Sequence, residues 1–220
     1  MGNRAAKDAM FEAFADVAKA LANGRRAELV DVLSQGERHV DELAAEIGQS
    51  VANTSFHLRA LATAGLVETR RDGTRIYYRL ASDRVGELWS AARDVAAAHH
   101  ELLDRLARDY LGDRSRLDEI GRDELAERLA SGDVVVLDVR PEAEFAAGHI
   151  AGARSIPIGR LAATVKDLPD GLEVVAYCRG RYCVFADDAV RLLRRRGRRA
   201  RRLEDGYPEW QRANLPVEVG

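Results

Sequence analysis

The spacing of apolar side chains in the first half of the chain is that of amphipathic helices. From Met10 onward, apolar residues recur at every third or fourth position, a period that favours helices over strands. The spacing predicts four short helices in succession, over 11–21, 25–36, 41–48 and 51–65. Asp41 and Ser50 stand at the starts of the third and fourth helices, where their side chains can cap free N–H groups.

The pattern changes to alternation between residues 66 and 80. Apolar and polar side chains alternate on both sides of Asp72-Gly73, a dipeptide that favours a tight turn, so we expect a β-hairpin here. The helical period then returns and predicts one long helix from Asp83 to Tyr110. The polar, glycine-containing residues 111–121 indicate a linker.

Strands and helices alternate in the second half. The runs DVVVLDV (133–139) and EVVAYC (173–178) are continuously apolar and rich in β-branched residues, which is typical of strands buried on both faces. Helical segments are expected over 121–130, 142–148, 184–197 and 207–213. This alternation predicts a small α/β domain with a mostly parallel sheet.

Charge and composition limit the classes of function. The formal net charge of -2 provides no overall positive field, so DNA binding would depend on a local basic surface. The N-terminal residues mix acidic with apolar side chains, and no stretch approaches the ~20 apolar residues that span a bilayer. We therefore expect a cytoplasmic protein with no membrane partner. Because thiols are kept reduced there, the cysteines Cys178 and Cys183 indicate chemistry more than a structural disulfide.

The third and fourth helices have the lengths and the turn of a helix-turn-helix, and the charged hairpin completes a winged helix-turn-helix. On the fourth helix, Thr54, Leu58 and Leu61 share the inner face, and small polar residues suited to base edges point outward. The hairpin arginines suit phosphates or the minor groove. The predicted DNA-contacting residues are Ser50, Ala52, Asn53, Ser55, Phe56, His57, Arg59, Arg70, Arg71 and Arg75. The alternative is a helical packing module with a solvated hairpin.

Residues 17–82 resemble the winged-helix domain of the ArsR family of repressors. The resemblance implies a homodimer built from the first and last helices, two recognition helices in successive major grooves of operator DNA, and release of DNA on binding an inducer. Metal-sensing members carry cysteines before or on the third helix, where this chain has ERHVDELA (37–44). The last helix offers Asp94, His99, His100 and Asp104, which do not match the family's paired metal ligands. We therefore expect no metal and no cofactor.

Both cysteines lie in the segment YCRGRYCVFA (177–186), between a predicted strand and a predicted helix. This placement turns main-chain N–H groups and a helix N-terminus toward the loop, an arrangement that stabilises a thiolate or an anionic persulfide. Arg179 and Arg181 add positive charge. The predicted reactive loop consists of Cys178, Arg179, Gly180, Arg181, Tyr182 and Cys183.

Segments 138–161 and 203–210, with the cysteine loop between them, resemble the signature segments of the rhodanese family in their proper order. The resemblance covers nearly all of residues 117–220. It implies that Cys178 accepts sulfane sulfur from a donor such as thiosulfate, polysulfide or persulfide and carries it as a persulfide. It also implies that Asp138 and Arg140 form a structural ion pair beneath the loop, and that His149 and Trp210 belong to the scaffold.

Cys183 is a departure from a plain sulfurtransferase, which needs only Cys178. Attack by Cys183 on a Cys178 persulfide, giving a disulfide or a longer polysulfide bridge, would convert the transfer site into a switch. The alternative is that Cys183 is a small buried apolar residue at the start of the helix. Two cysteines fall short of the ligands that zinc or arsenite takes, which disfavours a metal clip. We expect the arginine-dense residues 191–203 to be a solvated face, with an anion- or DNA-binding surface as the alternative.

Together these patterns predict an α+β winged helix-turn-helix domain over 1–112, followed by a small α/β rhodanese-like domain over 113–220. The expected function is that of a dimeric DNA-binding regulator, a repressor, whose rhodanese domain senses reactive sulfur through persulfidation of Cys178, with bridging to Cys183. Two alternatives stay open. One is a working thiosulfate-type sulfurtransferase that carries a DNA-binding domain, and the other is an arsenite-responsive regulator.

Overall fold

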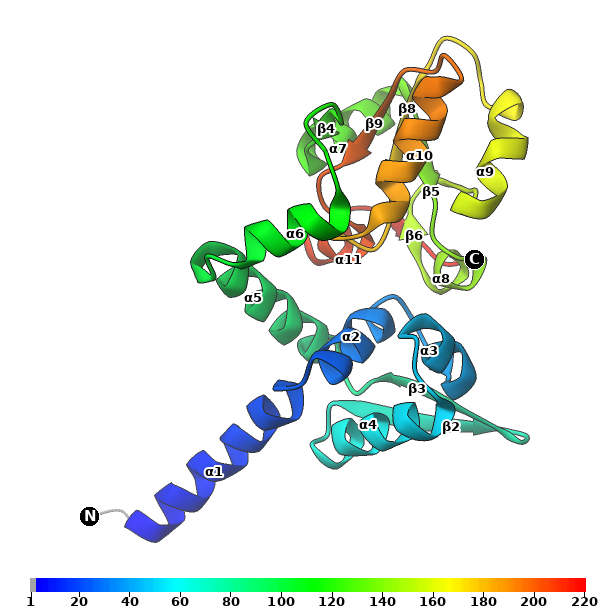
Figure 1. The fold of residues 1–220 in the computed structure, drawn as a ribbon. Coiled ribbons are helices and arrows are strands. Elements are labelled where there is room, and N and C mark those ends of the chain that lie inside the picture. The colour runs from blue at the N-terminus through cyan, green and yellow to red at the C-terminus, as the bar shows by residue number, and fades with distance from the viewer. Residues whose placement is uncertain (1–2) are drawn as a thin grey trace. The chain divides into compact units, whose positions relative to one another are not determined.

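The computed structural model describes residues 3–220, which fold as two compact units, unit 1 up to His99 and unit 2 from His100 to Gly220 (Figure 1). This division falls before the boundary after residue 112 that the sequence indicates. Within residues 3–220, no helix combines the length and the apolar character needed to cross a bilayer.

Unit 1 is a winged helix-turn-helix, as predicted. Its helices are α1 (Arg4–Leu21), α2 (Gly24–Leu33), α3 (Val40–Glu46), α4 (Val51–Thr63) and α5 (Asp83–His99). Its strands are β1 (Arg38–His39), β2 (Val67–Asp72) and β3 (Arg75–Leu80), in the order β1-β3-β2 with antiparallel pairing. Helices α3 and α4 supply the helix-turn-helix, and the β2–β3 hairpin is the wing.

Side-chain caps and a small apolar core define unit 1. The Asn23 side chain accepts hydrogen bonds from the first N–H groups of α2, and Ser50 caps α4. The N-cap of α3 is His39 rather than Asp41, because the His39 ring accepts the hydrogen bond of the Asp41 N–H at 3.1 Å. The core combines the inner faces of α2, α3 and α4; its fully buried members include Leu29, Leu43, Leu58 and Leu61.

The single long helix predicted over 83–110 is two helices. Helix α5 ends at His99, and α6 runs from Leu103 to Leu111. Between them, the chain makes a tight turn in which the Leu103 N–H donates to the carbonyl of His100 at 2.8 Å. This stretch contains neither glycine nor proline, so local sequence gives no signal for the break.

Unit 2 is the predicted α/β domain. Its main sheet contains β4 (Glu119–Ile120), β5 (Val134–Asp138), β7 (Arg154–Ser155), β8 (Glu173–Tyr177) and β9 (Ala200–Leu203), in the order β4-β9-β8-β5-β7. All neighbours in this sheet pair in parallel. Strands β6 (His149–Ile150) and β10 (Val217–Glu218) form a small antiparallel pair. The helices are α6, α7 (Arg122–Ser131), α8 (Glu142–Ala147), α9 (Ile158–Thr164), α10 (Val184–Arg195) and α11 (Tyr207–Arg212).

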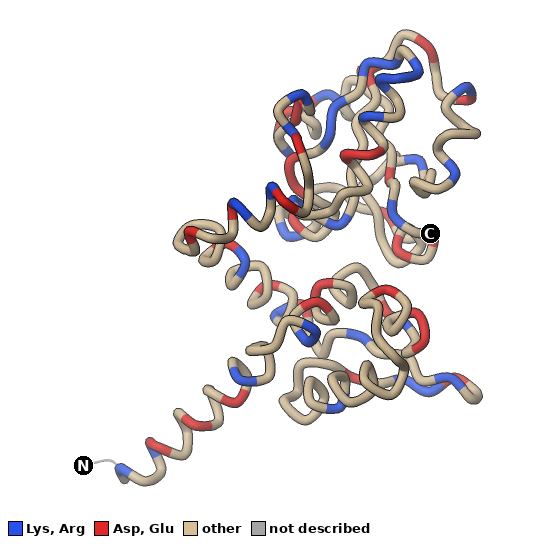
Figure 2. The backbone as a smooth tube through the Cα atoms, viewed as in Figure 1, with Lys and Arg blue, Asp and Glu red and all other residues tan. Residues whose placement is uncertain are grey.

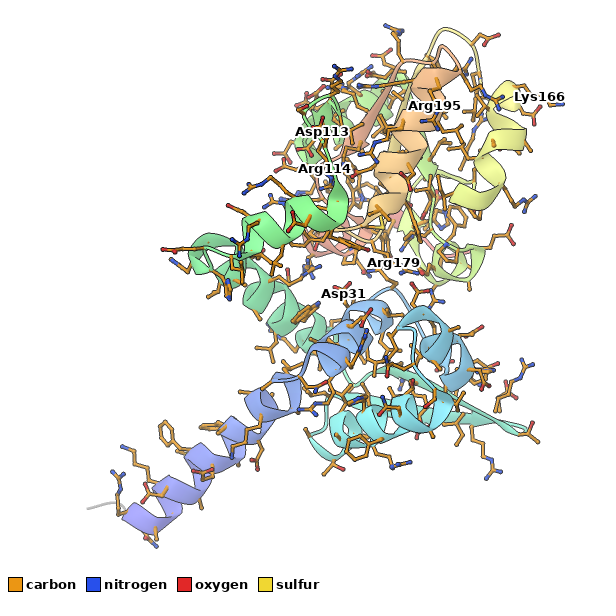
Figure 3. All side chains as sticks on the ribbon, viewed as in Figure 1. Asp31, Asp113, Arg114, Lys166, Arg179 and Arg195 are labelled. Carbon is orange, nitrogen blue, oxygen red and sulfur yellow. A yellow bond between two sulfur atoms is a disulfide. The ribbon has the colours of Figure 1, made fainter. Side chains whose placement is uncertain are left out.

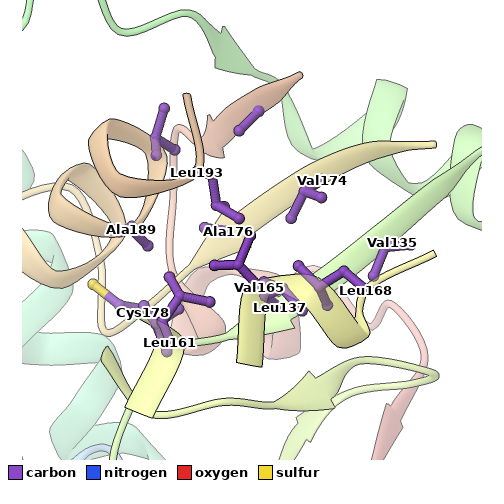
Figure 4. Packing of buried hydrophobic residues seen from close by; sticks show 14 residues of the cluster. Val135, Leu137, Leu161, Val165, Leu168, Val174, Ala176, Cys178, Ala189 and Leu193 are labelled. Carbon is purple, nitrogen blue, oxygen red and sulfur yellow. The ribbon is translucent and has the colours of Figure 1, made fainter. Parts of the chain in front are cut away.

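Apolar side chains of the central strands point to both faces of this sheet, as the continuous apolar runs predict. Val135 and Leu137 of β5 pack with α9 and α10, in the cluster seen in Figure 4. Val134 and Val136 of the same strand pack with α7 and α11 on the opposite face. This three-layer arrangement fixes the C-terminal end of β8, where the cysteine loop begins.

Most of the arginine-dense segment holds unit 2 together. Arg194 donates to the carbonyl of Ala200 at 2.9 Å, and Arg199 donates to the carbonyl of Gly171 at 2.7 Å. Arg202 is only 1% exposed. These contacts differ from the expected solvated face. Partners such as Gly171, Asp118 and Glu119 lie far from the segment in sequence and leave no local pattern there.

Candidate functional site

The exposed face of α4 carries half of the side chains that are predicted to contact DNA. The Ser50 hydroxyl accepts a hydrogen bond from the main-chain N–H of Asn53 at 3.2 Å, which fixes the start of the helix. The Asn53 amide donates to the side chain of Gln49 at 2.7 Å. Ala52, Asn53, Phe56 and Arg59 are exposed, and Ser55 is half-buried. The helix therefore presents an accessible surface of mixed polar and apolar side chains, and its contact with bases stays a prediction.

The structure corrects the prediction at His57. Its side chain is 8% exposed and lies on the buried side of α4 with Thr54, Leu58 and Leu61. These positions follow the i, i+3, i+4, i+7 spacing of a single helix face. His57 therefore faces the core of unit 1 and offers no surface for a phosphate contact.

On the wing, Arg70 is held by acidic neighbours. Its guanidinium lies 2.6 Å from Glu37 and 3.3 Å from Asp72, and it stacks over the Tyr77 ring at 4.7 Å. Hydrogen bonds to Glu37, and then to Asp72, raise the pKa of Arg70 above its ordinary value. Figure 2 marks the acidic and basic positions along this hairpin. Arg70 must leave these partners before it can bind a phosphate.

Arg71 and Arg75 are the more available arginines of the wing. Both are exposed near the hairpin tip. The Arg71 Nε donates to the carbonyl of Gly73 at 3.2 Å. A hydrogen bond with Tyr77 raises the pKa of Arg75. Both arginines stay charged at any physiological pH and suit phosphate contacts.

The cysteine loop joins β8 to α10. Cys178 follows the last residue of β8, and Cys183 is the N-cap of α10. Between them, the Cys183 N–H donates to the carbonyl of Gly180 at 3.1 Å. Gly180 has a φ of 151°, a conformation that glycine adopts without a steric penalty. The loop therefore lies where the sequence places it, at the C-terminal edge of the parallel sheet and beside a helix N-terminus.

The structure joins Cys178 and Cys183 in a disulfide bond. Their Cα atoms are 6.5 Å apart, within the range of about 4.4–6.8 Å that disulfides span. Cys178 is 2% exposed and belongs to the core cluster on the α9–α10 side of the sheet, near Leu161 and Ala189 (Figure 4). Cys183 is half-buried. The fold thus brings the sulfur atoms into bonding range, as a bridging role requires.

Ion pairs fix both arginines of the loop. Arg179 makes a two-pronged contact with Glu144 of α8, with a shortest distance of 2.6 Å, and its guanidinium lies 5.6 Å from the Phe185 ring. Arg181 pairs with the exposed Glu204 at 3.1 Å. The predicted positive charge of the loop is therefore balanced by neighbouring carboxylates, and these arginines hold the loop in place. Tyr182, between Arg181 and Cys183, is half-buried.

A buried ion pair lies close beneath the loop. Asp138 ends β5, and its carboxylate accepts hydrogen bonds from the Arg140 guanidinium at distances down to 2.5 Å. The Tyr177 hydroxyl donates to the same carboxylate at 2.6 Å. Asp138 and Arg140 are both fully buried. The geometry is that of a structural pair that ties the ends of β5 and β8 together.

The charges around this pair stay fixed over a wide pH range. Burial lowers the pKa of Arg140, but the hydrogen bonds and the charge of Asp138 outweigh that effect, so the pKa is raised overall. Burial, followed by the charge of Asp138, raises the pKa of Tyr177 far above its ordinary value. Arg140 therefore stays protonated and Tyr177 stays neutral at physiological pH.

Two further residues of the rhodanese-like segments are buried scaffold residues. His149 stacks on Phe145 with a ring separation of 3.6 Å. The Trp210 indole N–H donates to the carbonyl of Pro216 at 2.9 Å, and the side chain is fully buried. Neither side chain contacts the sulfur atoms in the described structure.

Sequence reasoning missed several residues that shape the loop. Glu144 holds Arg179, and the Tyr207 N–H donates to the carbonyl of Cys178 at 3.1 Å. Gly206 packs directly against the loop backbone, where a Cβ would lie 2.2 Å from the Gly180 nitrogen. The glycine of the LEDGYPEW segment was a usable signal, because close backbone approach is one reason for a glycine outside a turn.

The structure gathers no metal-binding group: within residues 3–220, no cluster of three or more His, Cys, Asp or Glu side chains has suitable geometry. His99 ends α5, and His100 lies beyond it in the turn. The structure therefore offers no ligand set from these histidines within the described chain.

Comparisons with known proteins match the N-terminal and C-terminal parts of the chain to two different families. Residues 23–69 match the description "Bacterial regulatory protein, arsR family", and residues 121–213 match "Rhodanese-like domain". The chain is 47% identical over 214 residues to the HTH-type transcriptional regulator Rv0324 of Mycobacterium tuberculosis, covering 97% of this chain and 94% of that protein.

Solved structures resemble each unit separately. A homodimeric winged helix-turn-helix DNA-binding domain from Mycobacterium bovis is 44% identical, covers 46% of this chain and 94% of its own, and has a TM-score of 0.43. A rhodanese-related protein from Thermoplasma volcanium is 27% identical, covers 47% of this chain and 99% of its own, and has a TM-score of 0.43.

Proposed function

Given that this chain belongs to the ArsR family of helix-turn-helix transcriptional regulators and carries a C-terminal rhodanese-like domain, we propose that unit 2 senses reactive sulfur and controls DNA binding by unit 1. The observation that carries the proposal is the bridging of Cys178 and Cys183 in the loop that follows β8. A sulfurtransferase needs one cysteine, whereas a switch needs a second cysteine within bonding range.

The chemistry of the switch takes two balanced steps. The Cys178 thiolate attacks the sulfane sulfur of a persulfide or polysulfide donor, so that Cys178 carries a persulfide. The rest of the donor leaves as a thiol if it was a persulfide, or as a shorter polysulfide. The Cys183 thiolate then attacks the Sγ of Cys178 and displaces the outer sulfur as hydrogen sulfide. The two thiols are oxidised to a disulfide, and the donor is reduced to hydrogen sulfide together with a thiol or a shorter polysulfide. No other oxidant is required.

The proposed DNA-binding form is a homodimer. Helix α1 leaves Met10, Phe11 and Phe14 exposed, and α5 leaves Leu88 and Val95 exposed. Removal of apolar side chains of this size from water by a partner subunit would stabilise the dimer. The first and last helices of unit 1 are therefore the proposed dimer interface, and two copies of α4 would then read operator DNA.

The test of this function is DNA affinity before and after sulfur treatment. We expect polysulfide to lower the affinity of the dimer by about fivefold or more, the range of ordinary allosteric coupling, for a duplex selected from a random pool. Cys178→Ser should abolish the response, because no persulfide can form. Fluorescence anisotropy at fixed salt measures the affinity, and intact mass follows the added sulfur and the loss of two hydrogens on bridging.

The Cys183→Ser variant separates a switch from an enzyme. It retains Cys178 and should load a persulfide without bridging, so its DNA affinity should stay at the reduced value. Unchanged affinity in the bridged wild-type protein would contradict the sensing proposal. Repeated turnover with thiosulfate and a thiol acceptor would then identify unit 2 as a sulfurtransferase.

Removal of a wing arginine should lower the affinity for DNA and should make that affinity depend less on the salt concentration. We expect Arg71→Gln to reduce the slope of log affinity against log salt by about 1 for each wing in contact with DNA, because one phosphate contact is lost. Arg79→Gln is the matched control, since Arg79 pairs with Glu68 at 2.9 Å. Equal effects of both variants would show that overall charge, and not the position of Arg71, sets the affinity.

A further inference from the structure

The C-terminal half of the cysteine loop is held by an arginine from outside the loop. Arg114 follows α6 and donates to the carbonyl of Arg181 at 2.8 Å and to the carbonyl of Cys183 at 3.3 Å. Its Nε donates to Asp187 of α10 at 2.5 Å. Figure 3 labels Arg114 at the end of α6. One guanidinium thus connects the segment after α6 to the cysteine loop and to the first turns of α10.

The surroundings of Asp187 allow Arg114 little freedom. Asp187 is fully buried, and its second oxygen lies 3.3 Å from the Nε of the buried Arg202. The terminal nitrogen of Arg202 lies 2.7 Å from Glu119. A buried carboxylate requires partners, and the Arg114 Nε supplies a directed hydrogen bond to it. The Arg114 side chain is therefore fixed between a rigid helix and a loop whose shape depends on the cysteines.

One face of α10 also binds the residues that follow α6. Asp187, Arg191 and Arg194 lie at i, i+4 and i+7, and so share a helix face. Arg191 donates to the carbonyl of Asp113 at 3.1 Å, and Arg194 contacts Asp118 at 2.7 Å. Because α10 begins directly after Cys183, the helix that carries this face is anchored at the reactive pair. We call residues 112–118 the relay segment.

We propose that Arg114 is a positioning residue that transmits the oxidation state of Cys178 and Cys183 to the relay segment. In the bridged form, the carbonyls of Arg181 and Cys183 are held where Arg114 binds them. Reduction releases Cys183 from Cys178, so these carbonyls are free to move, and Arg114 keeps only its contact with Asp187. The relay segment continues into α6, which residues 100–102 join to α5 of the DNA-binding unit. The inference rests on the proposed sulfur-sensing function, and it names how that site is regulated.

Hydrogen exchange of the relay segment tests the inference without DNA. The Ser115 N–H donates to the Asp113 side chain at 2.8 Å, and the Leu117 N–H donates to the Arg114 carbonyl at 2.9 Å, so both amides report on this segment. We expect both amides to exchange at least about fivefold more slowly in the disulfide form of the full-length protein than in its dithiol form. Equal exchange in the two forms overturns the proposal.

Variants identify Arg114 as the element responsible. In Arg114→Gln the disulfide should still form, as measured by intact mass, but the difference in exchange should disappear. Arg114→Lys keeps a charge beside buried Asp187, which protects the fold, and should also lose the difference because an ammonium lacks the guanidinium fork. Arg116→Gln is the matched control, since Arg116 is exposed and uses its main-chain carbonyl to bind Arg194. It should behave like wild type. A full exchange difference in either Arg114 variant overturns the proposal.

DNA affinity then distinguishes this inference from the proposed function. If both hold, wild type loses affinity on bridging, and Arg114→Gln bridges but keeps the affinity of the reduced form. If exchange depends on Arg114 while the wild-type affinity does not change, the relay exists and the sensing function fails. If the wild-type affinity changes and Arg114→Gln responds fully, sensing holds and the relay through Arg114 is overturned.

Discussion

Replacement of Asp138 by alanine is expected to lower the free energy of unfolding of unit 2 by about 3–5 kcal/mol. The substitution leaves the Arg140 guanidinium buried without its carboxylate, and it also removes the acceptor of the Tyr177 hydroxyl. A buried charge without a partner keeps the full desolvation cost. Because the pair ties β5 to β8, the loss should also reduce the order of the cysteine loop. Denaturant unfolding followed by the fluorescence of Trp210, which lies in unit 2, measures the change against a Trp89→Phe background.

Glu142→Ala is the matched control for this prediction. Glu142 pairs with Arg160, and both side chains are largely exposed, so the pair is screened by water. Its loss should change the stability by no more than about 1 kcal/mol. A similar small effect at Asp138 would contradict the structural role assigned to the buried pair. A double replacement, Asp138→Leu with Arg140→Met, should recover part of the stability, because it removes both buried charges together.

The elements of this fold were predictable where the apolar period was strong and local. The helix-turn-helix and wing, and the buried runs that became β5 and β8, each carry their signal within a few residues. The break between α5 and α6 was not predictable, because residues 100–102 contain no helix-breaking residue and the helical period continues across them. Helix α9 and strand β9 were also not predicted. The two-residue strands β1, β4, β6, β7 and β10 were missed because segments this short carry too few alternations to be recognised.

For the candidate site, too, features with a local signal in the sequence were predictable and features that depend on distant residues were not. The position of Cys178 at a strand end followed from the sequence, but the partners of the loop arginines did not. Arg179 and its partner Glu144 are 35 residues apart, and Arg181 and Glu204 are 23 apart. Only tertiary folding brings such groups together, so no local pattern marks them. At His57, by contrast, the signal was present: its spacing from Thr54 and Leu61 places it on the inner face.

Replacement of Gly206 by alanine is expected to slow sulfur loading of Cys178 by about 100-fold, the cost of displacing a reacting group by roughly 1 Å. An added Cβ would lie 2.2 Å from the Gly180 nitrogen and 2.4 Å from the Arg179 carbonyl carbon. Both are main-chain atoms, so no side chain can rotate away, and the loop itself must shift. The shift also weakens the hydrogen bond from the Tyr207 N–H to the carbonyl of Cys178.

The rate of mass increase with polysulfide, together with the yield of the disulfide, measures the effect at Gly206. Gly159→Ala serves as the control, because a Cβ there meets nothing within 4 Å and α9 should gain up to about 1 kcal/mol from a better helix former. Wild-type loading in Gly206→Ala would mean that the loop tolerates displacement. That outcome would also remove the basis for a rigid link between the cysteines and Arg114. A loop that adapts to a Cβ at Gly206 could also adapt to bridging without moving the carbonyls that Arg114 binds.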